Sequence, residues 1–366
     1  MSNLNQRGVR ALLYPRNVVI VGASERRGSW ARQVWANLTR FGYPHPIYPV
    51  NPRHQEVWGV PCYPEVGALP EPPDHLVVVV PADQAIQVVE QAAAQGARSA
   101  TIFASGFGEE GSPEGKERRR RLEEVIARTG IAVSGPNCLG NLSAPARLVT
   151  LTETRLREVE SGPVAIVGQS GGLVMALNRT LNDRGMAAAY MVTSGNEIGL
   201  KTADYLGFFA EEQAIRVILL FSETIADRDA FLTALDKARE AGKPVVAIKI
   251  GGSEAGRRAA LAHTGALAGS VAAFDAVTRD RGLIRVDTLD EMIELAEYFA
   301  HACLPQGPGI GCITFSGGLK GLILENAHRL NVNLPPLADA TESRLRQILG
   351  IGTSLGNPLD SGFTGL

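Results

Sequence analysis

The sequence predicts an α/β fold built from parallel β-sheets. Two observations predict it: runs rich in Val and Ile that do not alternate with polar residues, and helical patterns that follow them. Such runs begin at Val18, Val164 and Cys312. They are typical of strands buried on both faces, which alternate with helices in βαβ units. Because the runs are far apart, we expect three domains. These cover residues 1–150, 151–304 and 305–366.

In the first domain, a helix is expected after the strand at Val18. Apolar residues recur at helical spacing from Trp30 to Phe41, and the stripe stops at Gly42. Helices commonly end at a glycine, which adopts the left-handed conformation without strain. A second helix is expected over Asp83–Gln95. The further strands are expected over Pro46–Val50, Leu76–Val80, Ser99–Phe103 and Ile131–Ser134.

The second domain repeats this alternation after Gly162. Its further strands are expected near Ala188–Val192, Arg216–Phe221 and Val245–Ile250. A Pro- and Gly-containing stretch at Leu304–Gly311 predicts a linker into the third domain. That domain has one strand and helical segments near Leu319–Leu330 and Thr341–Leu349, too few elements for a sheet of its own. We therefore expect it to be completed by a longer chain or by a partner.

Composition argues against several classes of protein. The net charge is −2 at pH 7, and the densest basic run, Lys116–Arg121, lies among glutamates, so we predict a solvated helix face and no nucleic-acid site. The four cysteines lack paired spacing, which argues against a disulfide framework or a metal site on this chain. No apolar run is long enough to span a bilayer, and the first residues do not resemble a signal peptide. We expect a cytoplasmic protein without membrane contact.

The loop after the first strand reads GASERRGSW and begins at Gly22. It lacks the G-x-G-x-x-G spacing of dinucleotide-binding loops. An NAD site would also need an acid after the second strand, where the sequence has Asn51, Pro52 and Arg53. The charge of Arg53 favours a ligand that carries phosphate groups. A tight turn without a ligand stays open as the alternative.

Three further loops of this domain follow strands, and the carboxyl ends of parallel strands lie at one edge of a sheet. Val79–Asp83 and Ala104–Gly111 suit a nucleotide that lies along this edge. The third loop, Ser134–Asn141, contains Asn137 and Cys138. We interpret Cys138 as a packed small residue and not as a nucleophile, because no histidine lies near it in sequence.

The second domain opens with a stronger candidate for an anion site. Its first strand leads through Gly168 into Ser170, Gly171 and Gly172, and a helix follows. The glycines leave backbone N–H groups uncovered, and the helix N-terminus adds partial positive charge, so phosphate suits this loop best. The alternative is that Ser170 only caps the helix.

A histidine, His263, stands in the long loop after the strand that ends at Ile250. A loop histidine is more often a surface residue than a catalytic one. Glu223, however, ends the neighbouring strand, where its carboxylate could accept the imidazole proton and leave the other nitrogen free. An imidazole held in this way beside a phosphate loop is suited to attack phosphorus.

Several motifs occur in order over nearly the whole chain, and the block around His263 is the most specific. They read VVIVGAS, VNP, VVPA, GPNCLG, QSGGL, SEAGRRAALAHTGALAG and GNPLD. With them the chain resembles the nucleoside-diphosphate-forming (ADP-forming) acyl-CoA synthetase family, which is related to the succinyl-CoA synthetase α subunit. The resemblance implies a Rossmann-like CoA-binding domain followed by flavodoxin-like, succinyl-CoA synthetase-like domains.

The resemblance also implies the reaction carboxylic acid + CoA + ATP ⇌ acyl-CoA + ADP + phosphate. In the direction of ATP formation, phosphate attacks the thioester to give an acyl phosphate, and His263 takes the phosphoryl group. Glu223 orients the imidazole. Ser170, Gly171 and Gly172 receive the phosphoryl group at their helix N-terminus.

Coenzyme A is implied on the first domain, with the thioester end near Asn137 and Cys138. The loop of residues 193–206 keeps Asn196 but has Gly199 where many relatives carry an acid, which leaves the acid substrate open. The implied contacts of coenzyme A are Gly22, Ala23, Ser24, Arg53, Val80, Pro81, Ser105 and Gly106.

The sequence contains no ATP-grasp domain, the part of this family that binds ATP or ADP with Mg. The resemblance therefore implies half an enzyme that needs an ATP-grasp β-type subunit or C-terminal domain, and we expect an oligomer. One alternative is a CoA-sensing regulatory module, as in some protein acetyltransferases, but such modules tend to lack His263. The others are a CoA-dependent lyase on the same scaffold and, more weakly, an NAD-dependent dehydrogenase.

Overall fold

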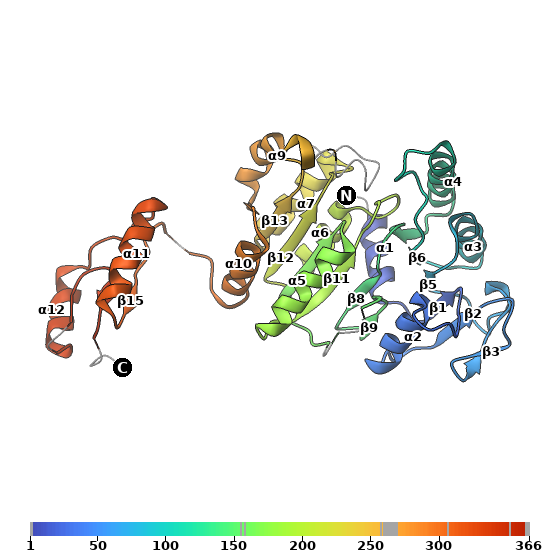
Figure 1. Cartoon of the computed structure of the whole chain (residues 1–366), viewed down its shortest axis with the longest axis horizontal. Coiled ribbons are helices and arrows are strands. Elements are labelled where there is room, and N and C mark those ends of the chain that lie inside the picture. Colours follow the sequence, from blue (N-terminus) through green and yellow to red (C-terminus); the bar gives the residue numbers. More distant parts are fainter. Residues whose placement is uncertain are drawn as a thin grey trace. The chain divides into compact units, whose positions relative to one another are not determined.

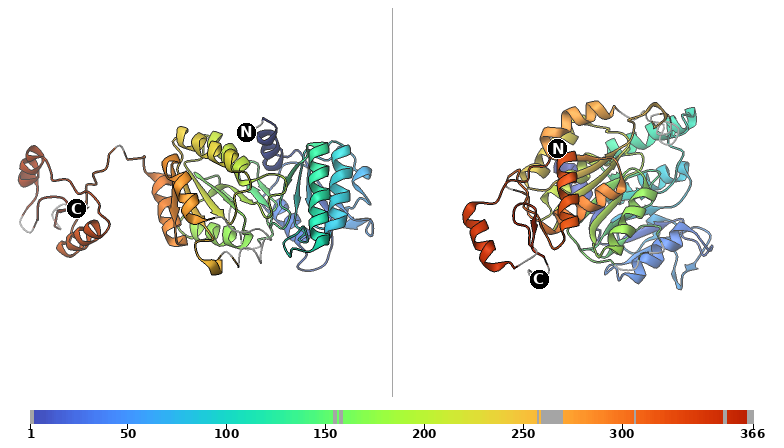
Figure 2. Two further views of the ribbon diagram at one scale, coloured as in Figure 1. Left: turned by 90° about the horizontal axis from the view of Figure 1, so that it is seen from above. Right: turned by 60° about the vertical axis from the view of Figure 1, so that its left-hand side comes forward.

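The computed structural model describes residues 3–153, 156, 159–256, 258, 270–305, 307–350 and 353–362. The chain forms two compact units, residues 1–302 and 303–366. The described part of the first unit contains two large sheets, each with helices packed against it, and one small two-stranded sheet (Figures 1 and 2). The prediction of an α/β fold with parallel sheets is confirmed.

The first sheet has the strand order β2-β1-β5-β6-β7, and its strands are all parallel. The elements of this part are α1 Asn3–Leu13, β1 Val18–Val21, α2 Trp30–Arg40, β2 Ile47–Val50, β3 Glu56–Val57, β4 Val60–Pro61, β5 His75–Val78, α3 Ala82–Ala94, β6 Ser99–Ile102, α4 Pro113–Thr129 and β7 Ala132–Ser134. Val18 and Ile20 pack on the side of α2, whereas Val19 and Val21 pack on the side of α3 and α4. Burial of β1 on both faces explains its unbroken apolar sequence.

The second sheet has the order β14-β13-β12-β10-β11-β8-β9. The elements of this part are β8 Asn141–Ser143, β9 Leu148–Val149, β10 Val164–Gly168, α5 Gly171–Asp183, β11 Ala188–Thr193, α6 Thr202–Glu211, β12 Val217–Ser222, α7 Arg228–Glu240, β13 Val245–Lys249, α9 Val271–Thr278, β14 Leu283–Val286 and α10 Leu289–His301. Its strands from β10 to β14 are parallel. Helices α5 and α10 cover one face, with α5 in front of the strands in Figure 1, and α1, α6, α7 and α9 cover the other.

The antiparallel hairpin of β8 and β9 belongs to the second sheet, where Met191 pairs with Leu142. It precedes residue 150, where we expected the first domain to end. The two sheets therefore divide the chain before residue 141. This could not be predicted from the sequence, because a short hairpin has no local pattern that indicates which sheet edge it joins.

The charged helix face is confirmed on α4. Arg119 pairs with Glu123 at 2.9 Å, and Arg120 pairs with Glu117 at 2.6 Å. All of these side chains are exposed. Arg119 and Arg120 are thus compensated along α4, whereas Arg118 and Arg121 pair with Asp83 of α3.

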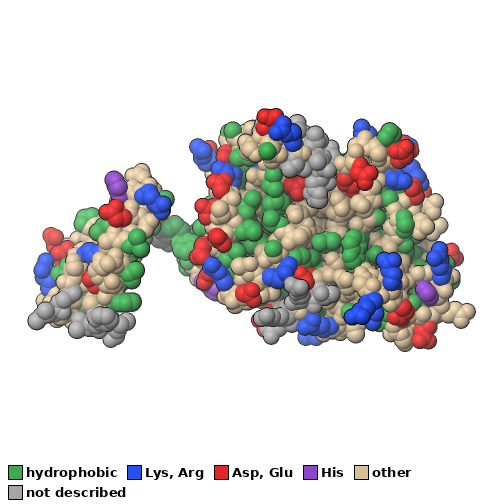
Figure 3. All heavy atoms as spheres, in the orientation of Figure 1, with side chains coloured by type: hydrophobic (Ala, Val, Ile, Leu, Met, Phe, Trp, Pro, Cys, Tyr) green, Lys and Arg blue, Asp and Glu red, His purple; other side chains and the backbone are tan. Residues whose placement is uncertain are grey.

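The second unit contains β15 Ile313–Thr314, α11 Gly317–Arg329, α12 Asp339–Ile348 and β16 Leu359–Asp360. Its described residues form a single pair of parallel strands, β15 and β16. Large apolar side chains stay on its surface, among them Ile313 at 77% exposure and Ile348 at 70% (Figure 3). In neither unit is any described helix both long enough and apolar enough to cross a membrane.

Candidate active site

Each of the two large sheets has its first parallel strand between two others. β1 lies between β2 and β5, and β10 lies between β11 and β12. In each sheet the next parallel strand in sequence lies on one side of this strand, and the later parallel strands lie on its other side. A crevice opens beyond the carboxyl ends of the strands at such a point. At the first crevice lies a cavity of about 500 Å³, lined by Gly22, Arg53, Val80 and Pro81, all of them predicted contacts of coenzyme A.

The turn after β1 lies directly on the sheet edge. The N–H groups of Gly22 and Ala23 donate to the carbonyl of Val50 at 3.0 and 3.2 Å. A Cβ at residue 22 would lie 2.6 Å from the carbonyl oxygen of Val79, and φ there is +91°. Only glycine fits this position. The amide of Asn51 donates to the carbonyl of Ala23 at 2.7 Å, so the residue that replaces the acid of an NAD site joins the first two loops.

Glutamines also line this cavity, and the sequence analysis missed them. Gln84, Gln87 and Gln91 come from α3, and Glu65 comes from the segment before it. The spacing of the three glutamines puts them on one helix face. The sequence contained a signal for these residues, because polar side chains at helical spacing indicate a helix face that can contact a ligand.

Four predicted contacts do not line the cavity, namely Ala23, Ser24, Ser105 and Gly106. Ala23 is fully buried and packs against Val57 and Cys62, so its side chain is not available to a ligand. The hydroxyl of Ser24 accepts the N–H of Arg26 at 3.2 Å, within a turn. Contact of these four residues with coenzyme A stays a prediction.

The loops after β7 and β11 meet, although they belong to different sheets. The N–H of Asn196 donates to the carbonyl of Pro136 at 3.0 Å, and the side-chain amide of Asn137 donates to that of Asn196 at 3.3 Å. Gly195 allows this contact, because its φ is +57° and a Cβ there would lie 2.2 Å from the Pro136 oxygen. The structure thus brings together Asn137 and the loop of residues 193–206, which the sequence singled out separately.

Cys138 is a packed residue, as its sequence context indicated. The side chain is 3% exposed, and the thiol donates to the carbonyl of Ile102 at 3.3 Å. Burial raises the pKa of the Cys138 thiol to about 12. Its thiolate, the form that acts as a nucleophile, is therefore scarce at neutral pH. Proximity of Cys138 to a thioester stays a prediction.

The glycine-rich loop after β10 forms the N-terminus of α5. The side chain of Ser170 makes no hydrogen bond that caps this helix, which counts against capping as its only role. A Cβ at Gly171 would lie 2.7 Å from the side chain of Leu139, whereas one at Gly172 would meet nothing within 4 Å. Packing therefore requires glycine at position 171, and glycine at position 172 leaves the positive end of the helix uncovered for an anion.

Gln169 joins this loop to the loop that carries Glu223. Its side-chain oxygen accepts the N–H groups of Glu223 and Thr224 at 2.7 and 2.9 Å, and its amide nitrogen donates to the carbonyl of Thr224 at 3.0 Å. Glu223 is 4% exposed. The backbone of Glu223 is thus held at the end of β12, next to the strand that leads into Ser170, and its side chain is buried there.

Comparison with known proteins identifies the family. A model of a CoA binding domain matches residues 16–144, and a model of a succinyl-CoA ligase like flavodoxin domain matches residues 161–299. The α subunit of ADP-forming acetate–CoA ligase II from Pyrococcus furiosus is 32% identical over 94% of this chain and 74% of its own length. The chain belongs to the ADP-forming acyl-CoA synthetase family. The predicted succession of a Rossmann-like CoA-binding domain and a flavodoxin-like domain is confirmed.

Other members of the synthetase family are longer. A trans-feruloyl-CoA synthase from an unknown prokaryotic organism is 33% identical over 97% of this chain and 50% of its own length. The chain spans about half the length of the curated relatives that it matches first. Among solved structures, a dinucleotide forming acetyl-coenzyme A synthetase 1 from Ca. Korarchaeum cryptofilum, in complex with phosphate and ADP, has a TM-score of 0.90 and 28% identity, covering 97% of this chain and 76% of its own.

Lys249 is a buried cation beside Glu223 that the sequence analysis missed. Lys249 is the last residue of β13 and is only 8% exposed. The ammonium group donates to the carbonyls of Glu223 and Ile250 at 2.5 and 2.6 Å. Burial lowers the pKa of Lys249, and the Glu223 charge opposes this shift. A lysine that ends an otherwise apolar strand was the available signal.

His263 lies outside the described residues, so its predicted pairing with Glu223 is not tested. The chain on either side of it is described. The N–H of Ile250 donates to the carbonyl of Ser222 at 3.0 Å, directly before Glu223. After residue 269 the chain continues at Ser270, which caps α9. Of the described residues that flank His263 in sequence, Ile250 therefore lies next to the end of β12, where Glu223 follows.

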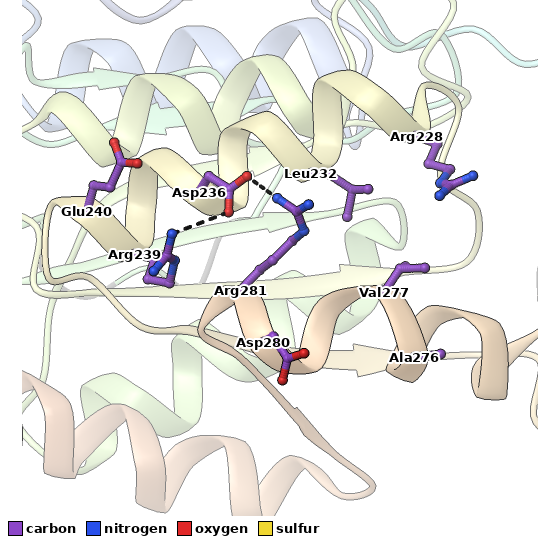
Figure 4. A pocket seen from close by; sticks show the side chains of 9 residues that line it. All are labelled: Arg228, Leu232, Asp236, Arg239, Glu240, Ala276, Val277, Asp280 and Arg281. Carbon is purple, nitrogen blue, oxygen red and sulfur yellow. Dashed lines mark hydrogen bonds and ion pairs between the residues drawn. The ribbon is translucent and has the colours of Figure 1, made fainter.

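A second hollow, of about 620 Å³, lies between α7 and the helical segment that ends at Arg281 (Figure 4). Asp236 lies between two arginines in it and pairs with Arg281 and, at 3.8 Å, with Arg239. None of the predicted site residues that the structure describes lines this hollow. Its charges are largely compensated within the protein.

Proposed function

We propose that the chain is the coenzyme A-binding, phosphoryl-accepting half of an ADP-forming acyl-CoA synthetase. The overall reaction is acyl-CoA + ADP + phosphate ⇌ carboxylic acid + CoA + ATP. A phosphate oxygen attacks the thioester carbonyl, and CoA leaves as the thiol. A nitrogen of His263 then attacks phosphorus, the acyl oxygen–phosphorus bond breaks, and the carboxylate departs. Transfer of the phosphoryl group to ADP completes the cycle.

The contact between Gln169 and the Glu223 loop is the observation that carries this proposal. It places a buried carboxyl group and an uncovered helix N-terminus at the ends of the neighbouring strands β12 and β10. The carboxyl group suits an imidazole N–H, and the N-terminus, with Ser170, Gly171 and Gly172, suits a phosphoryl group. Together they would hold the two partners of a phosphoryl transfer in line.

Coenzyme A fits the cavity at the first crevice. Gly22 has no side chain that would fill the cavity, and the charge of Arg53, which also lines it, suits a phosphate group of the cofactor. Val80 and Pro81 offer apolar surface in the same cavity. We propose that the chain of the cofactor continues past Ala23, Ser24, Ser105 and Gly106 toward Asn137 and Cys138.

A partner is required for the last step. We propose an ATP-grasp subunit, or an ATP-grasp domain further along the chain, that binds ADP or ATP with Mg, in an oligomeric enzyme. The longer relatives and the α-subunit name of the Pyrococcus furiosus relative support this. A small carboxylic acid is the proposed substrate, and the four free cysteines favour the cytoplasm as its location. The division into domains 1–150, 151–304 and 305–366 stays a prediction.

Phosphorylation of His263 tests the proposal. The enzyme with its ATP-grasp part is incubated with Mg and ATP, and intact mass spectrometry follows one added phosphoryl group. We expect a label that is labile in acid, absent in His263→Ala, and discharged by a carboxylic acid together with CoA. A folded enzyme that binds CoA but takes no label would contradict the proposal and favour a CoA-sensing regulatory module.

A further inference from the structure

Glu109 is a buried acid that connects loops of the two sheets. It lies between β6 and α4 and is 8% exposed. Its Oε2 accepts the N–H groups of Gly106 and Phe107 at 2.9 and 2.7 Å, within the first sheet's loop. Its Oε1 accepts the side-chain amide of Asn196, which follows β11 of the second sheet, at 2.5 Å. Both carboxylate oxygens are therefore used as acceptors.

The hydrogen bonds of Glu109 determine how the side-chain amides of Asn196 and Asn137 are oriented. An ionised carboxylate can only accept, so Asn196 must turn its NH₂ group toward Glu109 and its oxygen away. That oxygen accepts the NH₂ group of Asn137 at 3.3 Å. Asn137 consequently points its own amide oxygen elsewhere. Within the described part of the chain this oxygen makes no hydrogen bond, and Asn137 is only partly buried.

We propose that Glu109 is a positioning residue: acting through Asn196, it makes Asn137 present a hydrogen-bond acceptor to the ligand. This proposal rests on the proposed function, in which Asn137 lies near the thioester end of coenzyme A. The ligand group that binds to the Asn137 oxygen is then a hydrogen-bond donor, such as an amide N–H of the pantetheine arm or the free thiol. Glu109 also holds Gly106, so one carboxylate orders two loops that flank the cofactor.

Glu109→Gln tests the orientation of these two amides without changing the volume of the side chain. A glutamine keeps one oxygen for the N–H groups of Gly106 and Phe107 and turns a donor toward Asn196. Asn196 and Asn137 can follow by rotating their amides, so Asn137 then presents NH₂ in place of oxygen. The matched control is Glu110→Gln, which removes an exposed charge from the same loop.

Calorimetry on the chain measures affinity for CoA, and mass spectrometry on the enzyme with its ATP-grasp part measures phosphorylation of His263. We expect Glu109→Gln to weaken CoA binding about tenfold, the loss of a hydrogen bond at one site. Glu110→Gln should stay within about twofold of the wild type. Phosphorylation by ATP should be unchanged, because the described hydrogen bonds of the Glu109, Asn196 and Asn137 side chains do not involve Ser170, Gly171 or Gly172. In an Asn137→Ala background, Glu109→Gln should cost no further affinity.

The outcomes separate the two proposals. A wild-type enzyme that binds CoA but takes no phosphoryl group contradicts the proposed function. Equal CoA affinity of the wild type and Glu109→Gln overturns the role of Glu109. So does a full additional loss in the Asn137→Ala background, or a parallel loss of phosphorylation, since either would make Glu109 a general structural residue.

Discussion

The side-chain oxygen of Gln169 accepts the backbone N–H of Glu223 at 2.7 Å, although the residues are 54 positions apart in sequence. The same oxygen accepts the N–H of Thr224, and the amide nitrogen donates to the Thr224 carbonyl. One side chain thus continues the pairing of β10 with β12 beyond the last residues of the two strands. The position of Glu223 therefore depends on Gln169.

Replacing Gln169 should weaken the contact between the loops that follow β10 and β12. In Gln169→Ala two backbone donors lose their acceptor, and we expect a loss of about 1–3 kcal/mol in the free energy of unfolding. Gln169→Glu should not restore stability, because it keeps the accepting oxygen but turns a second carboxylate oxygen toward the Thr224 carbonyl, where the NH₂ group donated. Denaturant unfolding measures stability, and the rate of His263 phosphorylation measures the position of Glu223. Equal stability of the alanine variant and the wild type would show that the contact is unimportant.

Alanine substitutions at two glycines test the close contact between residue 22 and the Val79 carbonyl, beside the proposed coenzyme A cavity. Gly22 and Gly28 both have positive φ, +91° and +81°, but a Cβ meets the Val79 carbonyl only at Gly22 and meets nothing within 4 Å at Gly28. Both alanine variants bear backbone strain of about 1–3 kcal/mol. We expect Gly22→Ala to be the less stable and to bind CoA more weakly in calorimetry. Equal stability and equal CoA affinity of the two variants would show that the backbone at residue 22 shifts enough to accommodate the extra methyl group.

Acid should destabilise the first sheet through His75. The ring is fully buried between Ser99 and Thr101, and burial lowers its pKa from 6.5 to about 4. Between these values the unfolded chain binds more protons than the folded one, so stability falls as the pH decreases from 6.5 toward 4. The total loss is about 3 kcal/mol.

Urea unfolding at neutral pH and at about pH 4.5 measures this effect. We expect His75→Gln, which does not titrate, to lose less stability than the wild type between the two conditions. The exposed His54 offers the control, because His54→Gln should follow the wild type. A His75→Gln variant with the wild-type pH dependence would mean that the ring is not held neutral.

Cys138 and Cys303 should differ in reactivity toward iodoacetamide. Cys138 is buried with a pKa of about 12, whereas Cys303 is exposed. Because the thiolate is the reacting form, native protein at about pH 8 should be alkylated at Cys303 and spared at Cys138. Peptide mass spectrometry distinguishes the two sites, and unfolding in urea should make Cys138 reactive. Equal labelling of both thiols in native protein would contradict the burial of Cys138.

The strands and the local turns were predictable from the sequence. A strand buried on both faces must be apolar throughout, so β1 and β10 were evident from composition alone. The helix that ends before Gly42 was evident too, because its glycine has the positive φ that such an end requires. The loops that follow these strands could be named for the same reason, since parallel strands present their carboxyl ends at one edge.

What only the tertiary structure decided is which side chains meet between those loops. Glu109 and Asn196 are 87 residues apart and lie on loops of different sheets. Neither has a local pattern that points to the other, because a hydrogen bond across two sheets depends on how the sheets pack and not on sequence spacing. The same holds for Lys249 beside Glu223 and for the β8–β9 hairpin at the edge of the second sheet. Local periodicity specifies elements, whereas their convergence on a site is a property of the packed chain.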